Sequence, residues 1–471
     1  MSTGALTAKK KHTSELSFTT GSIPKTMLKF VGPFLLAVLV QNLYGAVDLF
    51  VVGHYATTAD VSAVTIGSQI MNIVTQVIIG FATGITVLIG RHFGANDQRG
   101  LARTTGTSIV LFGLLAAVLT AIYIGFHQMM VSMMQTPAEA IGATKEYLFV
   151  CSIGIVFIVG YNVAANILTG MGDSRTPFLF VVIACLINVT LDIILVRYFH
   201  MGALGAAVAT TIAQAGSFIF SLIYLRRKGL GFPFAKRDIR FDKPEVGRIL
   251  KIGGPVAIQN SMVGISFLFI TAIINQIGLA ASAAVGVVEK LILFLFVPAI
   301  ALGTAVSTAS SQNIGAGHEE RARKSMWWGV LMGLVPGIIF TIFCQFNGGL
   351  LTGILTSDPE VVGLAAEYLK SNIYDVILVS FVFCMNGFFN SCGKSWFSLL
   401  HSMISTFAIR IPLAYLFSTL QGATLFTIGL AAPISTVASM VLCFLFLAHM
   451  NRKKKKQFSG CSDKNSVDMI A

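Results

Sequence analysis

Six charged side chains lie inside long apolar segments of this sequence, and their cost makes each a functional candidate. The acids are Asp48, Asp192, Glu289 and Asp375, and the bases are Lys290 and Arg410. An ionisable side chain at the centre of a membrane span costs at least about 2.5–3.5 kcal/mol. Such residues typically line ion or proton pathways, or pair with one another.

Two of the acids have polar neighbours on their own helix faces. Gln41, Tyr44 and Asp48 have the spacing i, i+3, i+7, whereas Asn188 and Asp192 have the spacing i, i+4. Residues with these spacings share one face of an α-helix. At a rise of 1.5 Å per residue, both aspartates lie roughly 9 Å below the same membrane surface. We therefore expect the two faces to meet at one level of one helical bundle.

Thr210 stands at a similar depth in the next apolar segment, so the set becomes Asp48, Asn188, Asp192 and Thr210. Two carboxylates, a carboxamide and a hydroxyl are oxygen ligands suited to a small hard cation such as Na⁺. The same set is consistent with a proton site, because two neighbouring carboxylates can share one proton. A structural alternative is that these groups only hydrogen-bond helices to each other.

The other charged residues lie in the second half of the chain. Glu289 and Lys290 are sequence neighbours that point about 100° apart on a helix, so we expect at least one to face a central cavity. With Tyr44, they are candidates for a substrate cleft. Asp375 and Arg410 lie at matching depth in neighbouring segments, which predicts a structural ion pair.

These residues must be positioned by membrane-spanning helices. The chain has 471 residues, of which 55% are hydrophobic and 11% are charged, whereas soluble domains carry about 25% charged residues. A span needs about 20 apolar residues. This criterion predicts an all-α polytopic membrane protein with twelve spans, at 27–54, 62–90, 104–133, 144–169, 177–198, 202–226, 248–276, 281–312, 325–349, 362–390, 396–419 and 425–450.

The basic residues indicate the orientation of these spans. The formal net charge is +13, with 33 Lys and Arg against 20 Asp and Glu. Most of the Lys and Arg lie in one set of alternate loops and in both terminal segments, while the opposite loops carry only Lys145, Arg197 and Lys370. The positive-inside rule then predicts two cytoplasmic termini in a cell membrane, and it explains the charge without a nucleic-acid partner.

Motifs recur in the same order in the two halves of the sequence. Matching pairs are Lys29-Phe-Val-Gly-Pro33 with Lys251-Ile-Gly-Gly-Pro255, Gly94-Ala95 with Gly315-Ala316, Glu146-Tyr-Leu148 with Glu367-Tyr-Leu369, and Gly172-Asp-Ser174 with Gly393-Lys-Ser395. Six spans per repeat give both halves the same sense in the membrane and a pseudo-two-fold axis along its normal. We therefore predict an N-terminal segment (1–25), an N-lobe (26–228), a linker (229–247), a C-lobe (248–451) and a basic tail (452–471).

The sequence contains no motif that points to catalysis or to ATP. The segment Gly393-Lys-Ser395 resembles the end of a phosphate loop, but Phe388 stands where that loop needs its first glycine. No nucleophile–base or metal-ligand pattern is found, which argues against an enzyme, and a receptor rarely consists of two repeated six-span halves. We expect a secondary transporter without a cofactor that is driven by H⁺ or Na⁺.

The chain resembles the multidrug and toxic compound extrusion (MATE) transporters of prokaryotes over essentially its full length. The resemblance rests on Gly32-Pro33, Gln41, Tyr44 to Asp48, Val52-Gly53, the two Gly-Ala turns, Gly170-x-Gly172-Asp173, and Asn188 with Asp192. It implies the MATE fold, with two lobes that rock between inward and outward openings. It also implies export of drug-like, often cationic or amphipathic molecules in exchange for H⁺ or Na⁺.

Within this family the sequence is closer to the DinF-like branch than to the NorM-like branch. In the DinF-like branch the cation site lies in the N-lobe, and its positions fall on Asp48, Asn188, Asp192 and Thr210, with Gln41 nearby. The NorM-like branch adds acids in the C-lobe, but here Asn386 stands in the tenth span where an acid is expected, so Asn386 is a further cleft candidate.

The resemblance leaves one alternative within transport, a flippase or exporter of lipid-linked saccharides or another metabolite. A cleft for a lipid pyrophosphate should be strongly cationic, and only Lys290 and Arg410 are cations at depth. We expect a small-molecule substrate and the lipid bilayer as the partners of this chain. We expect no obligatory protein partner and a functional monomer.

Overall fold

The computed structural model describes residues 16–420, 422 and 424–467, and it describes no side chains after Arg452. The predicted N-terminal segment therefore lies largely outside the described residues, as do the side chains of nearly all the basic tail. Within the described part of the chain, twelve helical segments are long and apolar enough to cross a membrane. This finding confirms the all-α fold and the twelve predicted spans.

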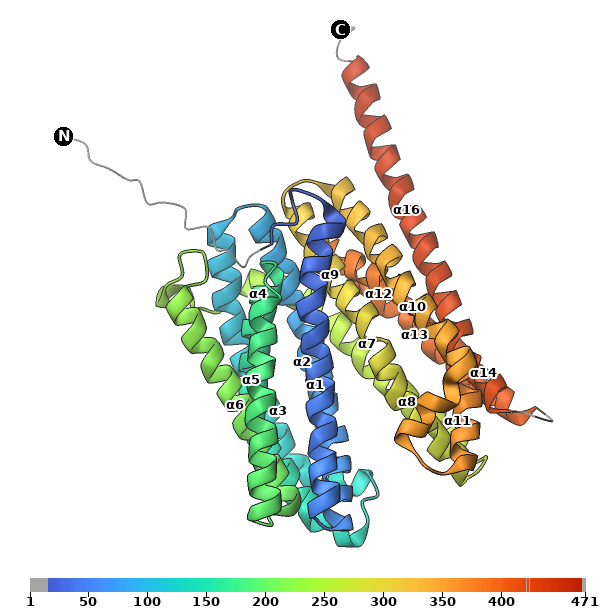
Figure 1. Cartoon of the computed structure of the whole chain (residues 1–471). Coiled ribbons are helices and arrows are strands. Elements are labelled where there is room, and N and C mark those ends of the chain that lie inside the picture. The colour runs from blue at the N-terminus through green and yellow to red at the C-terminus, as the bar shows by residue number, and fades with distance from the viewer. Residues whose placement is uncertain (1–15, 421, 423, 468–471) are drawn as a thin grey trace. The chain divides into compact units, whose positions relative to one another are not determined.

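The first six spans are single helices, one of which ends in a π-helical segment (Figure 1). They are α1 (Ile23–Tyr55), α2 (Thr58–Gly94), α3 (Gln98–Met133), α4 (Ile141–Gly170), α5 (Arg175–Asp192) with the π-helix Ile193–Tyr198, and α6 (Gly202–Lys228). Capping residues set several helix starts, because a side-chain oxygen there satisfies a free backbone N–H. The Thr57 hydroxyl accepts from the Asp60 N–H at 3.2 Å, and the Asp97 carboxylate accepts from the Gly100 N–H at 2.9 Å.

The second half contains more interrupted spans. They are built from α7 (Lys243–Asn275), α8 (Leu279–Leu295), α9 (Val297–Gly315), α10 (Glu319–Leu355), α11 (Pro359–Asn372), α12 (Tyr374–Ser391), α13 (Ser395–Met403), the π-helix Ile404–Arg410, α14 (Ile411–Thr419), α15 (Leu425–Gly429) and α16 (Ala431–Val467). The eighth span breaks between α8 and α9, and the tenth breaks between α11 and α12. The eleventh span contains the second of the two π-helices, so the fifth span of each repeat has a π-helical segment.

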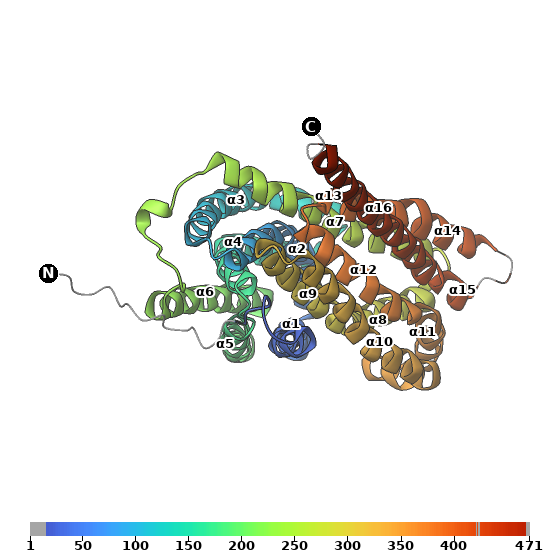
Figure 2. The ribbon, with the colours of Figure 1, turned by 90° about the horizontal axis from the view of Figure 1, so that it is seen from above.

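The described helices form two compact units whose boundaries differ from those of the two repeats. Of the described residues, unit 1 comprises 16–261, 304–328 and 390–395, and unit 2 comprises the others. In unit 1, α4 packs against α2, α3 and α6, while α1 packs against α5 (Figure 2). Unit 1 thus also contains parts of the second repeat, namely the first part of α7, most of α9, the start of α10 and the turn before α13.

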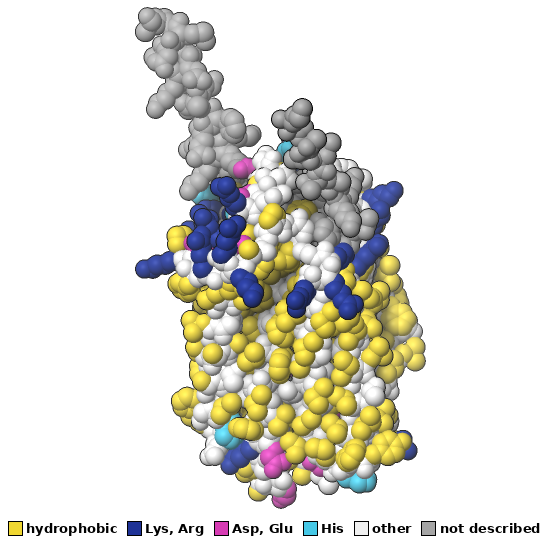
Figure 3. Space-filling view, turned by 90° about the vertical axis from the view of Figure 1, so that its left-hand side faces the viewer, with side chains coloured by type: hydrophobic (Ala, Val, Ile, Leu, Met, Phe, Trp, Pro, Cys, Tyr) yellow, Lys and Arg dark blue, Asp and Glu magenta, His cyan; other side chains and the backbone are white. Residues whose placement is uncertain are grey.

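Hydrophobic and basic side chains occupy different zones of the surface. On the face drawn in Figure 3, hydrophobic side chains cover the middle, while Lys and Arg gather at one end. In unit 1 this end, which we call the basic end, carries the end of α2 with Arg91, the start of α3 with Arg99 and the start of α5 with Arg175. An apolar belt with a basic margin is the pattern expected of a membrane protein.

Candidate functional site

The four residues predicted as an ion site lie together in unit 1, contributed by three helices. Asp48 of α1, Asn188 and Asp192 of α5 are all buried, with exposed fractions of 7%, 1% and 0%. The Thr210 hydroxyl of α6 donates to Asp48 Oδ2 at 3.3 Å and accepts from Asn188 Nδ2 at 3.3 Å. The carboxyl groups of Asp48 and Asp192 lie within hydrogen-bonding reach of each other.

Four oxygen atoms of this cluster are buried without a hydrogen-bond partner. They are Asp48 Oδ1, Asn188 Oδ1 and both carboxylate oxygens of Asp192. Buried acceptors are normally satisfied, so each unsatisfied one requires an explanation such as an ion or a proton. Two adjacent carboxylates in an apolar bundle are costly unless positive charge joins them. The donor set consists of oxygen atoms only, which suits Na⁺ or a proton shared by the two aspartates.

The helix that carries Asp192 changes geometry at this residue. The α-helix ends at Asp192, and the π-helical turns Ile193–Tyr198 follow at once. Such π-helical segments often occur at functional sites. The irregular backbone therefore marks the same position that the charge pattern selects.

Tyr44 and Gln41 lie on the same face of α1 as Asp48 but differ in their contacts. The Tyr44 hydroxyl accepts a hydrogen bond from Gln214 Nε2 of α6 at 3.2 Å. Gln41 is half-buried, and the hydrogen bonds described for the cluster do not include it. The structure thus adds Gln214, which the sequence reasoning did not select. The spacing of Thr210 and Gln214, i and i+4 on α6, could have identified it.

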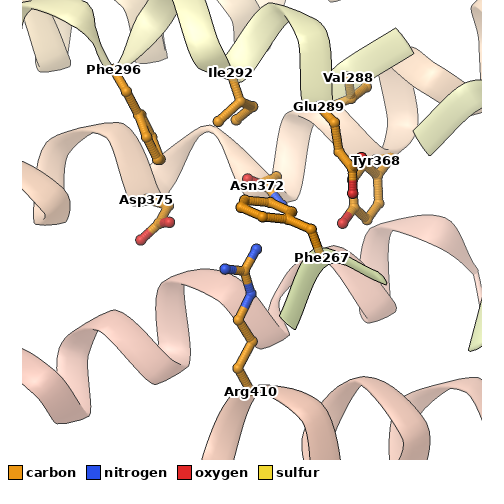
Figure 4. A pocket seen from close by; sticks show the side chains of 9 residues that line it. All are labelled: Phe267, Val288, Glu289, Ile292, Phe296, Tyr368, Asn372, Asp375 and Arg410. Carbon is orange, nitrogen blue, oxygen red and sulfur yellow. The ribbon is translucent and has the colours of Figure 1, made fainter. Parts of the chain in front are cut away.

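In unit 2, three of the predicted charged residues line one small cavity (Figure 4). Glu289 of α8, Asp375 of α12 and Arg410 surround it together with Tyr368 and Asn372. The Arg410 guanidinium lies over the Phe267 ring, 4.9 Å from its centroid. Arg410 and Asp375 thus line one cavity, and the ion pair between them stays a prediction. Matching depth placed both side chains in one pocket, but it could not determine their rotamers.

The remaining cleft candidates lie apart from this cavity. Lys290 is exposed and does not line it. The Asn386 carboxamide oxygen bonds His401 Nε2 at 2.8 Å, and His401 Nδ1 bonds the Ser439 hydroxyl at 2.7 Å. His401 is fully buried and was not selected from the sequence, because its partners lie on two other spans. An isolated histidine within an apolar segment is the pattern that could have drawn attention to it.

The basic end of unit 1 contains a pair of contacts that repeat each other. Arg91 donates through Nε to the Ser391 carbonyl at 3.1 Å, and Gln312 donates through Nε2 to the Gly170 carbonyl at 3.0 Å. Arg91 and Gln312 stand at equivalent places before the two Gly-Ala turns, and Gly170 and Ser391 at equivalent places before the two Gly-x-Ser turns. The two repeats therefore contact each other reciprocally.

Two glycines permit this reciprocal contact. A Cβ atom on Gly94 would overlap the Gln312 carbonyl, and a Cβ atom on Gly315 would overlap the Arg91 carbonyl. Only glycine lets two backbones approach so closely in a helix pair. The matched Gly-Ala turns of the sequence thus have a physical role, which is to close the basic end of unit 1.

The segment before α1 is bound to the same region. Gln312 Oε1 accepts from the Phe18 N–H at 3.0 Å. Arg321 donates to the carbonyls of Phe18, Thr20 and Gly21 at 2.9, 2.9 and 2.7 Å. The Phe18 ring is buried. The start of α1, the helix that carries Asp48, is therefore fastened to a segment of the second repeat.

Comparisons with known proteins place the chain among transporters. The MatE family profile matches twice, at residues 33–194 and 255–416. The chain is 28% identical to the probable multidrug resistance protein YpnP of Bacillus subtilis, covering 94% of this chain and 98% of that protein. It is 22% identical to the multidrug export protein MepA of Staphylococcus saprophyticus, with coverages of 94% and 98%.

Solved structures agree with these sequence matches. One is described as the outward-facing conformation of a multidrug resistance MATE family transporter of the MOP superfamily. It superposes with a TM-score of 0.89 at 21% identity and covers 95% of this chain and 100% of that one. A crystal structure of MATE in complex with MaL6 gives a TM-score of 0.89 at 20% identity, with coverages of 94% and 100%. These relatives are transporters rather than enzymes.

Proposed function

Since the chain belongs to the MATE family of multidrug transporters, we propose that it is a secondary antiporter that exports drug-like organic molecules in exchange for H⁺ or Na⁺. The four unpartnered oxygens of Asp48, Asn188 and Asp192 are the observation that carries this proposal. They provide negative charge and ligand atoms where a positively charged ion is needed. Export of drug-like molecules is in keeping with the names of the relatives, and we propose that the substrates are cationic or amphipathic.

The proposed mechanism starts with an ion at the Asp48–Asp192 cluster. Binding neutralises the two carboxylates and changes the packing of α1 against α5 and α6, because Asp48 and Thr210 are bonded across that interface. Pro33 lies within α1 and removes one backbone hydrogen bond, so α1 can bend near Pro33 and Gly45. Coupling requires that the ion and the substrate prefer different conformations.

We further propose a cell-membrane location with both termini cytoplasmic, since the basic end of unit 1 would then face the cytoplasm. The reciprocal contacts of Arg91 and Gln312 would close that side and would have to separate when the site opens inward. The coupling site in the first repeat favours the DinF-like branch. We expect a monomer to suffice, because each of these elements lies within one chain.

A vesicle assay tests the proposed function. The purified full-length protein would be reconstituted into lipid vesicles, and uptake of ethidium would be followed by fluorescence under an imposed Na⁺ or pH gradient. We expect Asp48→Asn to abolish gradient-driven transport while the protein remains folded. Glu139→Gln, which changes an exposed carboxylate, is the matched control. Undiminished transport by Asp48→Asn would overturn the assignment.

A further inference from the structure

The cavity in unit 2 lies where three helices are interrupted. Phe296 stands at the break between α8 and α9, Asn372 at the break between α11 and α12, and Arg410 at the end of a π-helical segment. Interrupted helices at membrane depth form the binding sites of many transporters, since the irregular backbone is tolerated only around a cavity. The position of this cavity therefore indicates a site rather than a packing defect.

Two residues that line the cavity, Tyr368 and Arg410, have counterparts in the first repeat. Tyr368 and Tyr147 are the tyrosines of the matched Glu-Tyr-Leu motifs. Arg410 stands one residue further from its Gly-x-Ser turn than Asn188 does, and the π-helical segment before Arg410 takes up this extra residue. Arg410 thus holds the place in the second repeat that Asn188 holds in the first.

The two aspartates of the first repeat have no acidic counterparts in the second. The same correspondence places Ile270 where the first repeat has Asp48 and Ala414 where it has Asp192. Both are buried. Where the first repeat has two carboxylates, the second repeat therefore has apolar side chains, and where the first has the neutral Asn188 the second has a cation. The acids of the second repeat lie on α8 and α12 instead.

The polar atoms that face the cavity match one water molecule. Glu289 Oε1 and Asp375 Oδ1 are acceptors without a partner, and Arg410 Nε is a donor without a partner. A water molecule donates two hydrogen bonds and accepts at least one. The cavity measures about 10 Å³ as space open to the centre of a water molecule, which is close to the minimum for one water.

We propose that Arg410 is a tethered cation, joined to Glu289 and Asp375 by one bridging water, which takes the place of an exchangeable ion in the second repeat. Only the first repeat then exchanges an ion. The guanidinium is always charged and is held over the Phe267 ring, where a cation is attracted to the aromatic face. Its single positive charge offsets one of the two carboxylates that line the cavity, Glu289 and Asp375, as an exchangeable ion would. This inference rests on the proposed exchange of an ion at Asp48 and Asp192.

The test is the number of ions exchanged per substrate. Full-length protein in lipid vesicles is clamped at zero membrane potential, and the ethidium gradient that stops net flux is measured against a tenfold gradient of H⁺ or of Na⁺. Each exchanged ion contributes a factor of ten to that ethidium gradient. Arg410→Met leaves the two carboxylates without their cation, so it should raise the balancing gradient about tenfold above the wild-type value.

Two further variants make the result specific. Arg410→Lys keeps a tethered cation and should keep the wild-type value, and Glu289→Gln should keep it too. An unchanged value in Arg410→Met, or a tenfold drop in Glu289→Gln, overturns the proposal. Failure of the proposed function itself would be distinguishable, since Asp48→Asn would then keep full coupling whatever Arg410 does.

Ion binding can still be measured in a variant that does not transport. The purified Arg410→Met protein in detergent would be titrated with ²²Na⁺, and proton release on adding ethidium would be recorded with a pH electrode. It should bind one more Na⁺ or release one more proton than the wild type. Equal numbers for the two proteins would contradict a tethered cation.

Discussion

Gly94 of α2 lies directly against the backbone carbonyl of Gln312 in α9, and no side chain fits between them. Gly315 stands in the same relation to Arg91. The four residues hold equivalent places in the two repeats, so one sequence motif produces both halves of the contact. Because the two backbones pack directly against each other with no side chain between them, such a contact is either fully formed or absent.

The first prediction follows from this contact. Gly94→Ala should prevent closure at the basic end and shift the protein towards the conformation that is open there. Labelling of the half-buried Cys392 next to this contact, with the other cysteines replaced, would report the change as faster reaction with a membrane-impermeant maleimide in inside-out vesicles. Gly125→Ala, at a glycine with open space around it, is the control and should label at the wild-type rate.

A second prediction concerns the hydroxyl that joins α6 to the ion cluster. Thr210→Val keeps the side-chain shape but removes the donor to Asp48 Oδ2. Hydrogen bonds between membrane helices contribute about 0.6 kcal/mol on average and up to about 1.7 kcal/mol. We therefore expect apparent ion affinity to fall roughly threefold to twentyfold, with maximal transport retained. The measurement is the dependence of ethidium transport on ion concentration.

Thr211→Val is the matched control for this variant, because the Thr211 hydroxyl donates to the Val150 carbonyl instead. It should leave the ion dependence unchanged. If Thr210→Val and Thr211→Val behaved alike, the hydroxyl of Thr210 would have no special part in ion binding, and the cluster would reduce to its two carboxylates.

Much of the first site follows from the sequence because helical periodicity fixes both face and depth. Asp48, Asn188, Asp192 and Thr210 were selected on that basis, and the structure brings them together. The Asp375–Arg410 ion pair stays a prediction, because periodicity places both residues at one cavity but does not determine which way the long arginine side chain extends. The break before Tyr374 was also missed, since neither proline nor glycine stands at Ile373 to indicate it. His401 is recognisable only once three spans are placed beside one another.

A third prediction tests the fastening of the segment before α1. Arg321→Ala removes three hydrogen bonds to the carbonyls of Phe18, Thr20 and Gly21. Each hydrogen bond to a charged group contributes about 1.5–3 kcal/mol to stability when it is buried, and less when it is exposed. We expect the segment to detach, with faster protease cleavage before residue 22 in inside-out vesicles. Lys324→Ala breaks only an exposed pair with Glu320 and should cleave at the wild-type rate.

The last prediction concerns His401, whose two ring nitrogens are both bonded inside unit 2. His401→Leu would leave the Asn386 carboxamide oxygen and the Ser439 hydroxyl without their present partner. An unsatisfied buried polar group costs about 1–3 kcal/mol, so the variant should unfold at a clearly lower temperature in detergent. Ser439→Ala removes one partner and leaves the contact between His401 and Asn386, so its melting temperature should fall less. Melting temperatures equal to wild type in both variants would show that the network does not hold α12, α13 and α16 together. A loss of ion coupling with unchanged melting temperature would instead place His401 in the transport cycle.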